Sequence, residues 1–551
     1  MNEKLAELLL PQIEQTTEYY ENLYPARNLP EGARVTRIAP SPTGFLHLGT
    51  LYVAMIDRKV ATDTKGVFYM RIEDTDKKRE VAGGIENLIS GFSEFGINID
   101  EGYTSTGSQG EYGPYRQSER AEIYGAYVKK LICEGKAYPC FCSEKTMAKT
   151  AEGQKAKKEK TGYYGKYRTC RELSFEEIKQ KIDNKESYII RLKSEGNEEN
   201  KVFVDDIIKG KLEIPQNDED IVILKSDFIP TYHFAHAVDD HLMHTTHVLR
   251  GDEWVSSLAK HIELFKTLGF KVPKYAHIAP IMTEENGNKR KLSKRKDPQA
   301  AVHYFLEQGY PPECVTEYLY TIASSEFENW RRANQTESLD KFNLNLKKMS
   351  VSGALFDNDK LNDVSKNIIS KMSADEVLEK LTAWVKTYNS EYFELLTKDQ
   401  AFTKEIFSID RDVPKPRKDI AKWDEAEAFS AFFFDELFTS QYNLPEHIKS
   451  KSAVELLSEY LPNYDENDDN QQWFQKVKDI CPNVGFCPDM KEYKANPENY
   501  KGSVSDAGTI IRVAITGRQN SPDLCQIMKL LGKQKVNDRI NKAINFYKGG
   551  K

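Results

Sequence analysis

The stretch that decides the fold class is residues 34–72, which read RVTRIAPSPTGFLHLGTLYVAMIDRKVATDTKGVFYMRI. Residues 34–40 are rich in β-formers and run straight into Ser41-Pro42-Thr43-Gly44, a turn by composition. Residues 50–65 then place apolar side chains at helical spacing, and Gly66 follows at the position expected for a C-cap. A second strand over 67–72 completes a β-turn-α-β unit, which predicts the start of an α/β domain.

The pattern of strands and helices continues and is interrupted once. A helical pattern runs from Ser118 to a stop at Gly135, and residues 140–171 are then rich in lysine and tyrosine, which predicts an insertion separate from the sheet. Strand signals return at 187–192, 201–204, 220–224, 231–238 and 247–250. The sequence therefore predicts an α/β domain that is split by an insertion.

Beyond about residue 350 the pattern becomes mostly helical. Ser373 with Glu376, and Ser452 with Glu455, match the capping box that begins many helices. Residues 465–470 are polar and acidic, as in a loop. These signals predict an all-α region in the second part of the chain.

Composition limits the class of protein. A chain of 551 residues allows several domains, and 39% hydrophobic and 30% charged residues with a mean hydropathy of −0.63 argue against a membrane protein. The N-terminal residues lack the basic start and cleavage site of a signal peptide, so we expect a cytoplasmic protein with reduced cysteines. The net charge of −7 does not decide against a nucleic-acid partner, because 78 basic residues can concentrate on one face.

Two motifs point to nucleotide chemistry. After the first strand, a helix N-terminus would offer backbone N–H groups to phosphate, and Gly44 and Gly49 would let a nucleotide approach the backbone. His47 would hydrogen-bond charge that develops on a phosphoryl group. The second motif is residues 289–296, where six cations in eight positions repel one another unless an anion lies among them. Each motif alone also fits an ordinary βα loop or a solvated face, but their pairing favours a nucleotide site.

These motifs resemble those of a known family, the class I aminoacyl-tRNA synthetases, and within it the bacterial glutamyl-tRNA synthetases. His47-Leu48-Gly49-Thr50 is similar to the first signature of the family, and Lys291-Leu292-Ser293-Lys294-Arg295 is similar to the second. Further similar stretches follow the family order, at 71–76, 113–120, 232–243, 512–517 and 531–533. The resemblance covers roughly residues 34–547.

The resemblance implies a Rossmann-type catalytic domain that is split by an acceptor-binding insertion and followed by an all-α anticodon-binding region. The expected segments are an N-terminal extension (1–33), the first catalytic half (34–112), the acceptor-end-binding insertion (113–215), the second catalytic half (216–272), a stem-contact region with the second signature loop (273–355) and two helical anticodon-binding subdomains (356–440 and 441–551). The extension is longer than the family pattern predicts.

The resemblance also implies an activity: a monomer with no membrane contact would activate L-glutamate with ATP and Mg²⁺ and transfer it to the 3′ end of tRNA(Glu). The implied catalytic residues are His47, Thr50, Lys291 and Lys294. The implied ATP-binding residues are Ser41, Gly44, His47, Gly49, Glu253, Lys291, Ser293 and Lys294. The implied glutamate-binding residues are Arg37 for the side-chain carboxylate and Glu73 for the ammonium group, with Ala39, Ser41, Tyr232 and Arg250 around them.

Side-chain chemistry agrees with this assignment. Glutamate carries an ammonium group and two carboxylates, and an arginine fork binds a carboxylate through two hydrogen bonds. A glutamine site would have less use for the cation, because a neutral amide does not balance a buried arginine. The alternative is that Arg37 and Glu73 form a salt bridge at the strand end. His236 lies where the family more commonly has a smaller polar residue such as asparagine, which puts substrate contacts there in question.

Cys140-Phe141-Cys142 followed by Cys170 resembles a zinc-binding element found in part of the family. A closed zinc site needs four donors, and Tyr167 or Glu172 would have to be the fourth. Zinc is therefore an alternative that the sequence leaves open.

Contacts to tRNA and several rival functions also stay open. The lysines and tyrosines of 140–171 suit an acceptor end, and the basic loop 414–418 suits an anticodon arm, but either also fits a solvated surface. One rival is a non-discriminating enzyme that also charges tRNA(Gln). The others are a small-molecule nucleotidyltransferase, which would not need some two hundred helical residues, and a non-catalytic tRNA-binding paralogue, which would not need to keep His47, Lys291 and Lys294.

Overall fold

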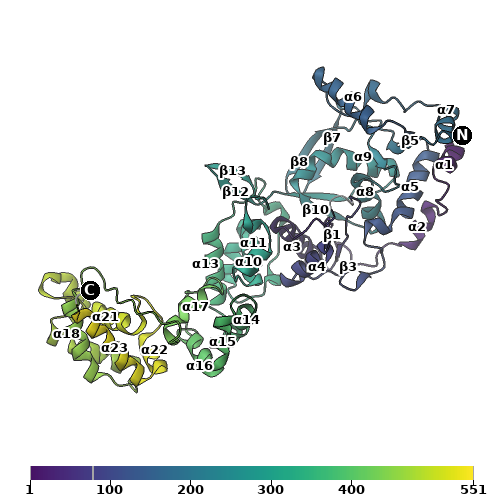
Figure 1. The fold of residues 1–551 in the computed structure, drawn as a ribbon. Coiled ribbons are helices and arrows are strands. Elements are labelled where there is room, and N and C mark those ends of the chain that lie inside the picture. Colours follow the sequence, from purple (N-terminus) through teal and green to yellow (C-terminus); the bar gives the residue numbers. More distant parts are fainter. Residues whose placement is uncertain (1, 77–79, 550–551) are drawn as a thin grey trace. The chain divides into compact units, whose positions relative to one another are not determined.

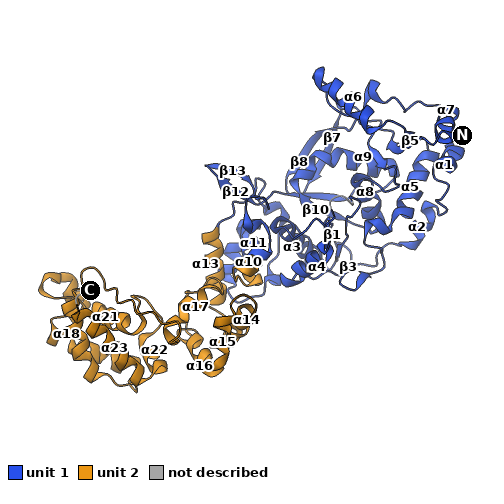
Figure 2. Ribbon diagram, viewed as in Figure 1, with its two compact units in different colours: residues 1–304, 316–357 blue, residues 305–315, 358–551 orange. Residues whose placement is uncertain are grey.

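The computed structural model describes residues 2–76 and 80–549, and Figure 1 shows their fold. Met1 and Lys551, the outer ends of the two expected terminal segments, lie outside the described residues. The chain forms two compact units, one made of residues 1–304 and 316–357 and the other of 305–315 and 358–551 (Figure 2). The named strands all belong to the first unit, so an α/β region is followed by an all-α region, as predicted. Among the described residues, no helix is long and apolar enough to cross a membrane.

Parallel strands form the base of the first unit. β1 (Val35–Ile38) pairs in parallel with β2 (Val67–Met70) through α3 (Leu48–Asp63), and β2 pairs in parallel with β3 (Glu101–Thr104) after α4 (Gly84–Glu94). β4 (Gly107–Gln109) closes this sheet antiparallel to β3. The predicted β-turn-α-β unit is therefore present. Gly66 is not the C-cap of α3, which is Thr64; a Cβ at position 66 would lie 1.9 Å from the Arg34 carbonyl oxygen, so close chain approach requires glycine there.

The second half of the α/β region joins the first at β1. β10 (His247–Gly251) pairs in parallel with β11 (Lys274–Ile278), and α9 (Leu258–Leu268) connects the two strands. The Thr246 amide donates to the Val35 carbonyl at 3.0 Å, and the Val35 amide donates to the Thr246 hydroxyl at 2.8 Å. One layer is thus assembled from segments that are about 200 residues apart in the chain.

The strand predicted at 231–238 is wrong, because these residues begin helix α8 (Tyr232–Leu242). Almost every side chain from Phe234 to Asp240 is buried, so the helix has no polar face along most of its length. In a short segment that is buried on all sides, apolar residues repeat neither every 2 residues, as in a half-buried strand, nor every 3.6, as in an amphipathic helix. Hydrophobic periodicity therefore does not distinguish helix from strand there.

The insertion has its own antiparallel sheet, in the order β5 (Ala137–Cys140), β6 (Ile189–Leu192) and β9 (Val222–Leu224), and a hairpin of β7 (Lys201–Asp206) and β8 (Gly210–Pro215). β9 belongs to this sheet although it lies beyond the expected end of the insertion at residue 215, because it pairs with β6 and not with the parallel strands. Its helices are α5 (Ala121–Cys133), α6 (Glu144–Ala156) and α7 (Phe175–Asp183). Its strands are separate from the parallel sheet, as predicted. Its hydrophobic core is not separate, because Ile190 and Leu192 belong to the same buried cluster as Val35 and Tyr69.

The N-terminal extension packs on the outside of this core. Its helices α1 (Asn2–Leu9) and α2 (Thr17–Leu23) bury Leu9 and Tyr20 in the cluster that also contains α5. Arg27 donates to both carboxylate oxygens of Glu101, at 2.7 and 2.9 Å, and to the Met243 carbonyl at 3.0 Å. Because Glu101 lies on β3 and Met243 follows α8, the extension ties the two halves of the α/β region together.

A hairpin of β12 (Met282–Glu285) and β13 (Asn288–Lys291) presents the second signature. Its turn residues Asn286 and Gly287 both have positive φ, 53° and 76°, as a two-residue turn of type I′ requires. Helix α12 (Ser325–Ala333) completes the first unit, and α10 (His303–Glu307) and α11 (Pro312–Ala323) each contain residues of both units.

The second unit consists of helices around one hydrophobic cluster. The capping box of Ser373 and Glu376 is present at α14. The one predicted at Ser452 is wrong: the N-cap of α18 is Lys449, and Ser452 lies buried in the first turn. The helices are α13 (Asn358–Ile369), α14 (Ala374–Tyr388), α15 (Ser390–Lys398), α16 (Gln400–Ser408), α17 (Glu425–Ser430), α18 (Ser450–Tyr460), α19 (Asn470–Ile480), α20 (Met490–Ala495), α21 (Val504–Thr516), α22 (Leu524–Leu531) and α23 (Lys533–Lys548).

Candidate active site

A cavity of about 550 Å³ lies in the first unit at the carboxyl ends of β1, β10 and β11, the edge where α/β sheets bind ligands. Of the fourteen substrate-binding and catalytic residues expected from the sequence, eleven line it: Arg37, Ala39, Ser41, His47, Gly49, Thr50, Glu73, Tyr232, Arg250, Glu253 and Lys291. The other three, Gly44, Ser293 and Lys294, are not among its lining residues.

His47 is the N-cap of α3. Its Nδ1 accepts a hydrogen bond from the Gly49 amide at 2.9 Å, and a Cβ at position 49 would lie 3.1 Å from that nitrogen, so glycine leaves room for the cap. Burial, then the charges of Lys294 and Lys291, lowers the pKa of His47 to about 4. The ring is therefore neutral near pH 7 and carries its proton on Nε2, where it can donate to a phosphate oxygen.

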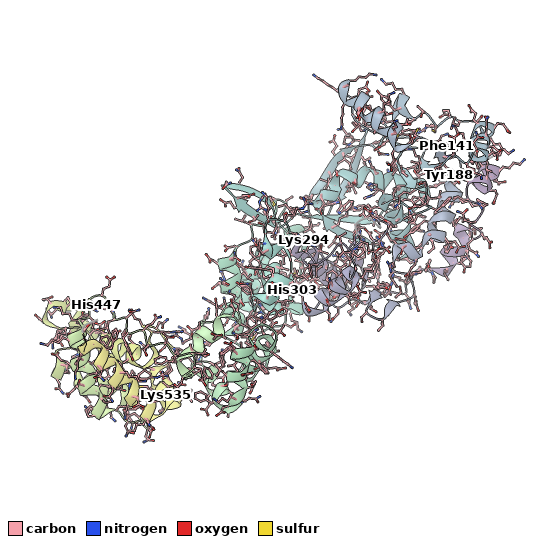
Figure 3. All side chains as sticks on the ribbon, in the orientation of Figure 1. Phe141, Tyr188, Lys294, His303, His447 and Lys535 are labelled. Carbon is pink, nitrogen blue, oxygen red and sulfur yellow. The ribbon has the colours of Figure 1, made fainter. Side chains whose placement is uncertain are left out.

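The two signatures meet at this helix start. Lys291 ends β13 and lines the cavity, with its Nζ 3.3 Å from Glu253 Oε2. The Lys294 ammonium donates to the Phe45 carbonyl in the first motif, and Figure 3 labels its side chain. Burial lowers the pKa of Lys294. Both lysines thus lie close enough to His47 to act on its charge state.

Asp297 fixes the loop of the second signature. It pairs with Arg290 at 2.6 Å and accepts a hydrogen bond from the Ser293 amide at 2.8 Å. Ser293 is therefore part of the loop structure. Gly44 has φ of 112°, which the turn requires, and it is not among the lining residues.

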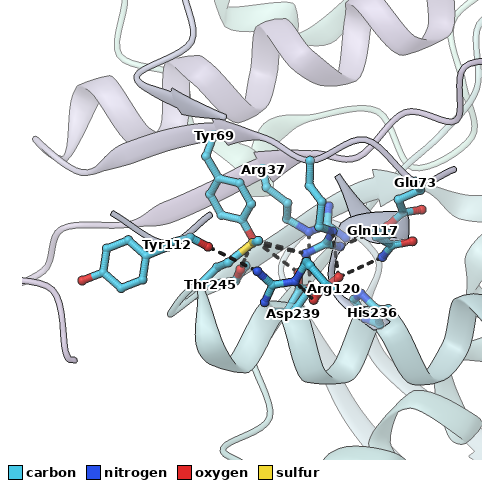
Figure 4. Close-up of polar contacts among 12 residues, drawn as sticks. Arg37, Tyr69, Glu73, Tyr112, Gln117, Arg120, His236, Asp239 and Thr245 are labelled. Carbon is cyan, nitrogen blue, oxygen red and sulfur yellow. Dashed lines mark hydrogen bonds and ion pairs between the residues drawn. The ribbon is translucent and has the colours of Figure 1, made fainter. Parts of the chain in front are cut away.

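Arg37 and Glu73 line the cavity above a buried layer of ion pairs (Figure 4). They do not pair with each other: Arg37 Nε lies 3.3 Å from Asp240, whereas Glu73 accepts from Arg71 at 3.0 Å. Arg71 also donates to Asp240 at 2.7 Å. Burial raises the pKa of Glu73 to about 7, against the opposing charges of Arg71 and Arg37. A cationic group entering the cavity would therefore favour the ionised form of Glu73.

Below this layer, Asp239 joins two motifs that are distant in the sequence. It accepts hydrogen bonds from Arg120 at 2.7 Å, Gln117 at 2.9 Å and Tyr124 at 2.8 Å. Gln117 and Arg120 belong to the stretch 113–120, and Asp239 lies on α8 (Figure 4). The network holds α8, and with it Tyr232, at the cavity wall.

Arg250 is a buried cation without an acidic partner. It is 5% exposed, and its guanidinium donates from Nε to His277 at 3.1 Å and from Nη1 to His261 at 3.1 Å. Its Nη2 has no hydrogen-bond partner, and among the described residues no carboxylate forms an ion pair with it. The Tyr275 ring covers it at 4.9 Å. A desolvated, unbalanced guanidinium in a cavity wall favours an anionic ligand.

Trp254 is a cavity residue that the sequence analysis missed. It follows Glu253 directly and stacks on Tyr232 with ring centroids 4.4 Å apart. His236 does not line the cavity: it is fully buried on α8, stacked behind Tyr232 at 6.0 Å, with Nδ1 3.0 Å from Asp240. Burial lowers its pKa to about 4. His236 therefore supports the wall rather than facing a ligand.

The three cysteines expected for a metal site gather in the insertion. The sulfurs of Cys140, Cys142 and Cys170 lie within 4.8 Å of one another, and those of Cys142 and Cys170 are 3.7 Å apart. The Tyr163 hydroxyl lies 3.6 Å from the Cys140 sulfur and 3.7 Å from that of Cys142. A tetrahedral zinc with Zn–S bonds of about 2.3 Å places its sulfurs roughly 3.8 Å apart, so this donor set fits zinc.

Both residues expected as the fourth donor have other partners. Tyr167 hydrogen-bonds Glu159, and the largely exposed Glu172 lies 3.7 Å from Arg171. The hydroxyl oxygen beside the sulfurs of Cys140 and Cys142 belongs to Tyr163, which is 1% exposed and so is not available to stack on bases.

The candidate tRNA surfaces remain exposed. Lys155, Lys157 and Lys158 are exposed at the end of α6. In the second unit, the loop 414–418 is exposed at its lysines, while Arg417 pairs with Asp419 at 2.8 Å. Some aromatic rings of the insertion pack on each other, such as Phe141 and Tyr188 at 5.8 Å between ring centroids (Figure 3), whereas Phe203 on β7 is exposed.

Comparisons with known proteins agree along the whole chain. The catalytic-domain model of class I tRNA synthetases for glutamate and glutamine matches residues 34–363, and an anticodon-binding domain model matches 491–544. The chain is 49% identical over 550 residues to a glutamate–tRNA ligase of Clostridium beijerinckii, covering 99% of this chain and 100% of the relative. It is 40% identical to one of Sorangium cellulosum over 95% of this chain and 97% of the relative. The crystal structure of a glutamate tRNA ligase from Elizabethkingia meningosepticum in complex with its amino acid matches with a TM-score of 0.74 at 26% identity, covering 93% of this chain and 99% of that one.

Proposed function

Because the chain belongs to the class I tRNA synthetases for glutamate and glutamine, we propose that it is a glutamate–tRNA ligase. It activates L-glutamate with ATP, releases pyrophosphate, and transfers the glutamyl group to the 3′ end of tRNA(Glu). The near-complete match to glutamate–tRNA ligases supports this activity. The alternative that the chain is a small-molecule nucleotidyltransferase has no support from those matches. The match to an anticodon-binding domain model argues against that alternative.

The observation that carries the proposal of an amino-acid substrate is the guanidinium of Arg250, which is left for the α-carboxylate when Arg37 takes the side-chain carboxylate. The Nη2 of Arg250 is buried and unpartnered at the cavity, and a carboxylate would satisfy it and balance its charge. Because glutamine carries the same α-carboxylate, the choice of glutamate over glutamine rests on Arg37, which is assigned to the side-chain carboxylate, and on the match to glutamate–tRNA ligases.

The other cavity residues complete an amino-acid pocket. Arg37 takes the side-chain carboxylate, and Glu73 takes the ammonium group, which favours the ionised form of this carboxyl. Ala39, Ser41 and Tyr232 form the rest of the wall, with Trp254 behind the tyrosine. A free amino acid presents one cation and two anions, and the pocket offers the complementary set.

ATP lies on the signature side of the cavity. The α-carboxylate of glutamate attacks the α-phosphorus, and pyrophosphate leaves. The neutral His47 donates from Nε2 to a phosphoryl oxygen in the transition state, Thr50 and Gly49 face the phosphates at the start of α3, and Glu253 faces the nucleoside. Lys291 and Lys294 neutralise the leaving group. Mg²⁺, held by the phosphates, would add further neutralisation of the leaving pyrophosphate.

We assign the tRNA to the insertion and the helical unit. The terminal ribose hydroxyl attacks the adenylate in a second step that depends on positioning. Segment 113–215 takes the acceptor end, 273–355 contacts the stem, and 356–440 with 441–551 take the anticodon arm, which the domain match at 491–544 supports. We assign the catalytic halves to 34–112 and 216–272, the second extended to the end of β11 at Ile278 because β11 pairs with β10. A monomeric state and a cytoplasmic location stay predictions.

The insertion also binds zinc in this proposal. Cys140, Cys142 and Cys170 supply three sulfurs, and Tyr163 supplies the fourth donor atom. The ion would fix the chain between β5 and α7.

ATP–pyrophosphate exchange tests the activity, with glutamate or glutamine and with or without total tRNA. We expect exchange with glutamate in the presence of tRNA. Arg250→Gln should raise the glutamate KM roughly 10- to 100-fold, as loss of a charged hydrogen bond predicts, while Arg332→Gln, an exposed arginine on α12, should not. Exchange with glutamine instead would overturn the pocket, and no exchange would favour the non-catalytic paralogue.

A further inference from the structure

The imidazole of His277 fixes one side of the Arg250 guanidinium. Arginine donates hydrogen bonds and does not accept them, so the contact at 3.1 Å requires an unprotonated Nε2 on His277. The ring proton must then lie on Nδ1, and burial lowers the pKa of His277, which keeps the ring neutral. The orientation of Arg250 therefore depends on a group that accepts the Nδ1 proton.

That group is Asp206, the last residue of β7. Its Oδ2 lies 2.7 Å from His277 Nδ1 and accepts from the His277 amide at 3.1 Å, while its Oδ1 accepts from the amides of Ile208 and Lys209 at 3.0 and 2.7 Å. Burial alone would raise the pKa of Asp206, but these hydrogen bonds lower it below its ordinary value. An ionised carboxylate thus faces His277 and holds one tautomer.

Asp206 reaches this position from the insertion. Along β7 the side chains alternate, so that Val202 and Val204 pack inward with Asp206 while Phe203 and Asp205 face solvent. The next residue, Ile207, donates its amide to the Tyr275 carbonyl on β11 at 2.9 Å. The hairpin of the insertion is therefore bonded directly to the strand that carries His277.

We propose that Asp206 is a positioning residue for glutamate: through His277 it orients the guanidinium of Arg250 toward the α-carboxylate of the substrate. The inference rests on the proposed function and deepens it. It also makes the pocket depend on the seating of the β7–β8 hairpin, a part of the segment assigned to the acceptor end of tRNA.

The substitution Asp206→Asn tests the role at nearly constant volume. If the amide oxygen faces His277, the NH₂ group opposes the amides of Ile208 and Lys209; if the NH₂ group faces His277, the ring must move its proton to Nε2, against the donor of Arg250. In both orientations of the new amide, one hydrogen-bond donor lies opposite another, so one hydrogen bond is lost. The matched control is Asp205→Asn, on the exposed face of the same strand.

The measurement is the KM for glutamate and for ATP in exchange with tRNA present, together with the melting temperature. We expect Asp206→Asn to raise the glutamate KM roughly tenfold, with the ATP KM within about twofold of wild type and no change for Asp205→Asn. In a His277→Gln background, the amide oxygen can accept from Arg250 without Asp206, so the same substitution should have little further effect.

Three results would overturn the proposal: an unchanged glutamate KM in Asp206→Asn, a parallel rise in both KM values, or the same rise in the His277→Gln background. The wild-type chain in the same assay distinguishes failure of the proposed function from failure of the proposed role of Asp206. Absence of glutamate-dependent exchange in wild type would refute the proposed function and this role with it. Exchange in wild type with an unaffected Asp206→Asn variant would refute only the role of Asp206.

Discussion

His47 has two separable tasks, and two substitutions distinguish them. Its Nδ1 caps α3 by accepting from the Gly49 amide at 2.9 Å, and its Nε2 is assigned to a phosphoryl oxygen. In His47→Asn the side-chain oxygen can still cap the helix, because asparagine is a preferred N-cap residue, but the donor to phosphate is lost. In His47→Ala both are lost.

The expected magnitudes follow from these contacts. Loss of an N-cap side chain costs about 1 kcal/mol of stability, so His47→Ala should be less stable than His47→Asn by that amount. Loss of one donor to a transition-state oxygen costs about 2.7–4 kcal/mol, which is on the order of 10²- to 10³-fold in rate. Both variants should therefore lose exchange activity alike while they differ in stability.

Urea unfolding and ATP–pyrophosphate exchange with glutamate and tRNA measure the two effects in parallel. Equal stability of the alanine and asparagine variants would refute the capping argument. Retention of more than about a hundredth of the exchange rate in either variant would refute the phosphate assignment, since removal of the donor should cost at least about 100-fold.

Three further predictions concern charge and metal. Arg120→Met should lower the free energy of unfolding by about 3 kcal/mol, because it removes the nearest cation from the buried Asp239 and leaves the Arg71 ion pair at 3.5 Å with the hydrogen bonds from Gln117 and Tyr124. Arg250→Met should cost much less, because among the described residues no carboxylate pairs with Arg250; equal losses in urea unfolding would contradict this. Mass spectrometry of the purified chain should find one zinc, and Tyr163→Phe should reduce zinc retention against a chelator; full retention would exclude the hydroxyl as a donor. Acidification from pH 7.5 to 5.5 should lower the urea midpoint. Burial lowers the pKa values of four histidines, His47, His233, His236 and His247, to about 4 and that of His261 well below its ordinary value, while unfolded imidazoles take up protons near pH 6.5. Burial also raises the pKa values of the Asp57, Glu73 and Glu263 carboxyls, which opposes the effect with fewer protons; an unchanged midpoint would contradict the prediction.

The parts of the fold that sequence predicted were those specified locally. In residues 34–72, proline and glycine mark clear boundaries between strand, turn and helix patterns. The observed elements begin and end within two or three residues of the predicted bounds. Helix α8 was mistaken for a strand because burial on nearly all sides removes the periodic signal. Ser452 failed as a cap because its helix begins two residues earlier, at Ser450.

In the candidate site, too, the residues within sequence motifs were predictable, whereas the contacts between distant segments were not. The ordered motifs predicted Arg37, His47 and Lys291 as site residues, and in the structure all three line one cavity. The support for Arg250 was not predictable, because Asp206 and His277 are 71 residues apart and meet only through the pairing of the hairpin with β11. Hydrogen bonds between distant strands leave no pattern in a single sequence.

Charging of purified transcripts tests the central claim most directly. The chain would be incubated with ATP, Mg²⁺ and radiolabelled glutamate or glutamine, separately with tRNA(Glu) and tRNA(Gln). We predict glutamate esterified to tRNA(Glu); additional charging of tRNA(Gln) with glutamate would select the non-discriminating alternative and keep the chemistry. Glutamine on either tRNA, or no labelled tRNA under any condition, would contradict the account.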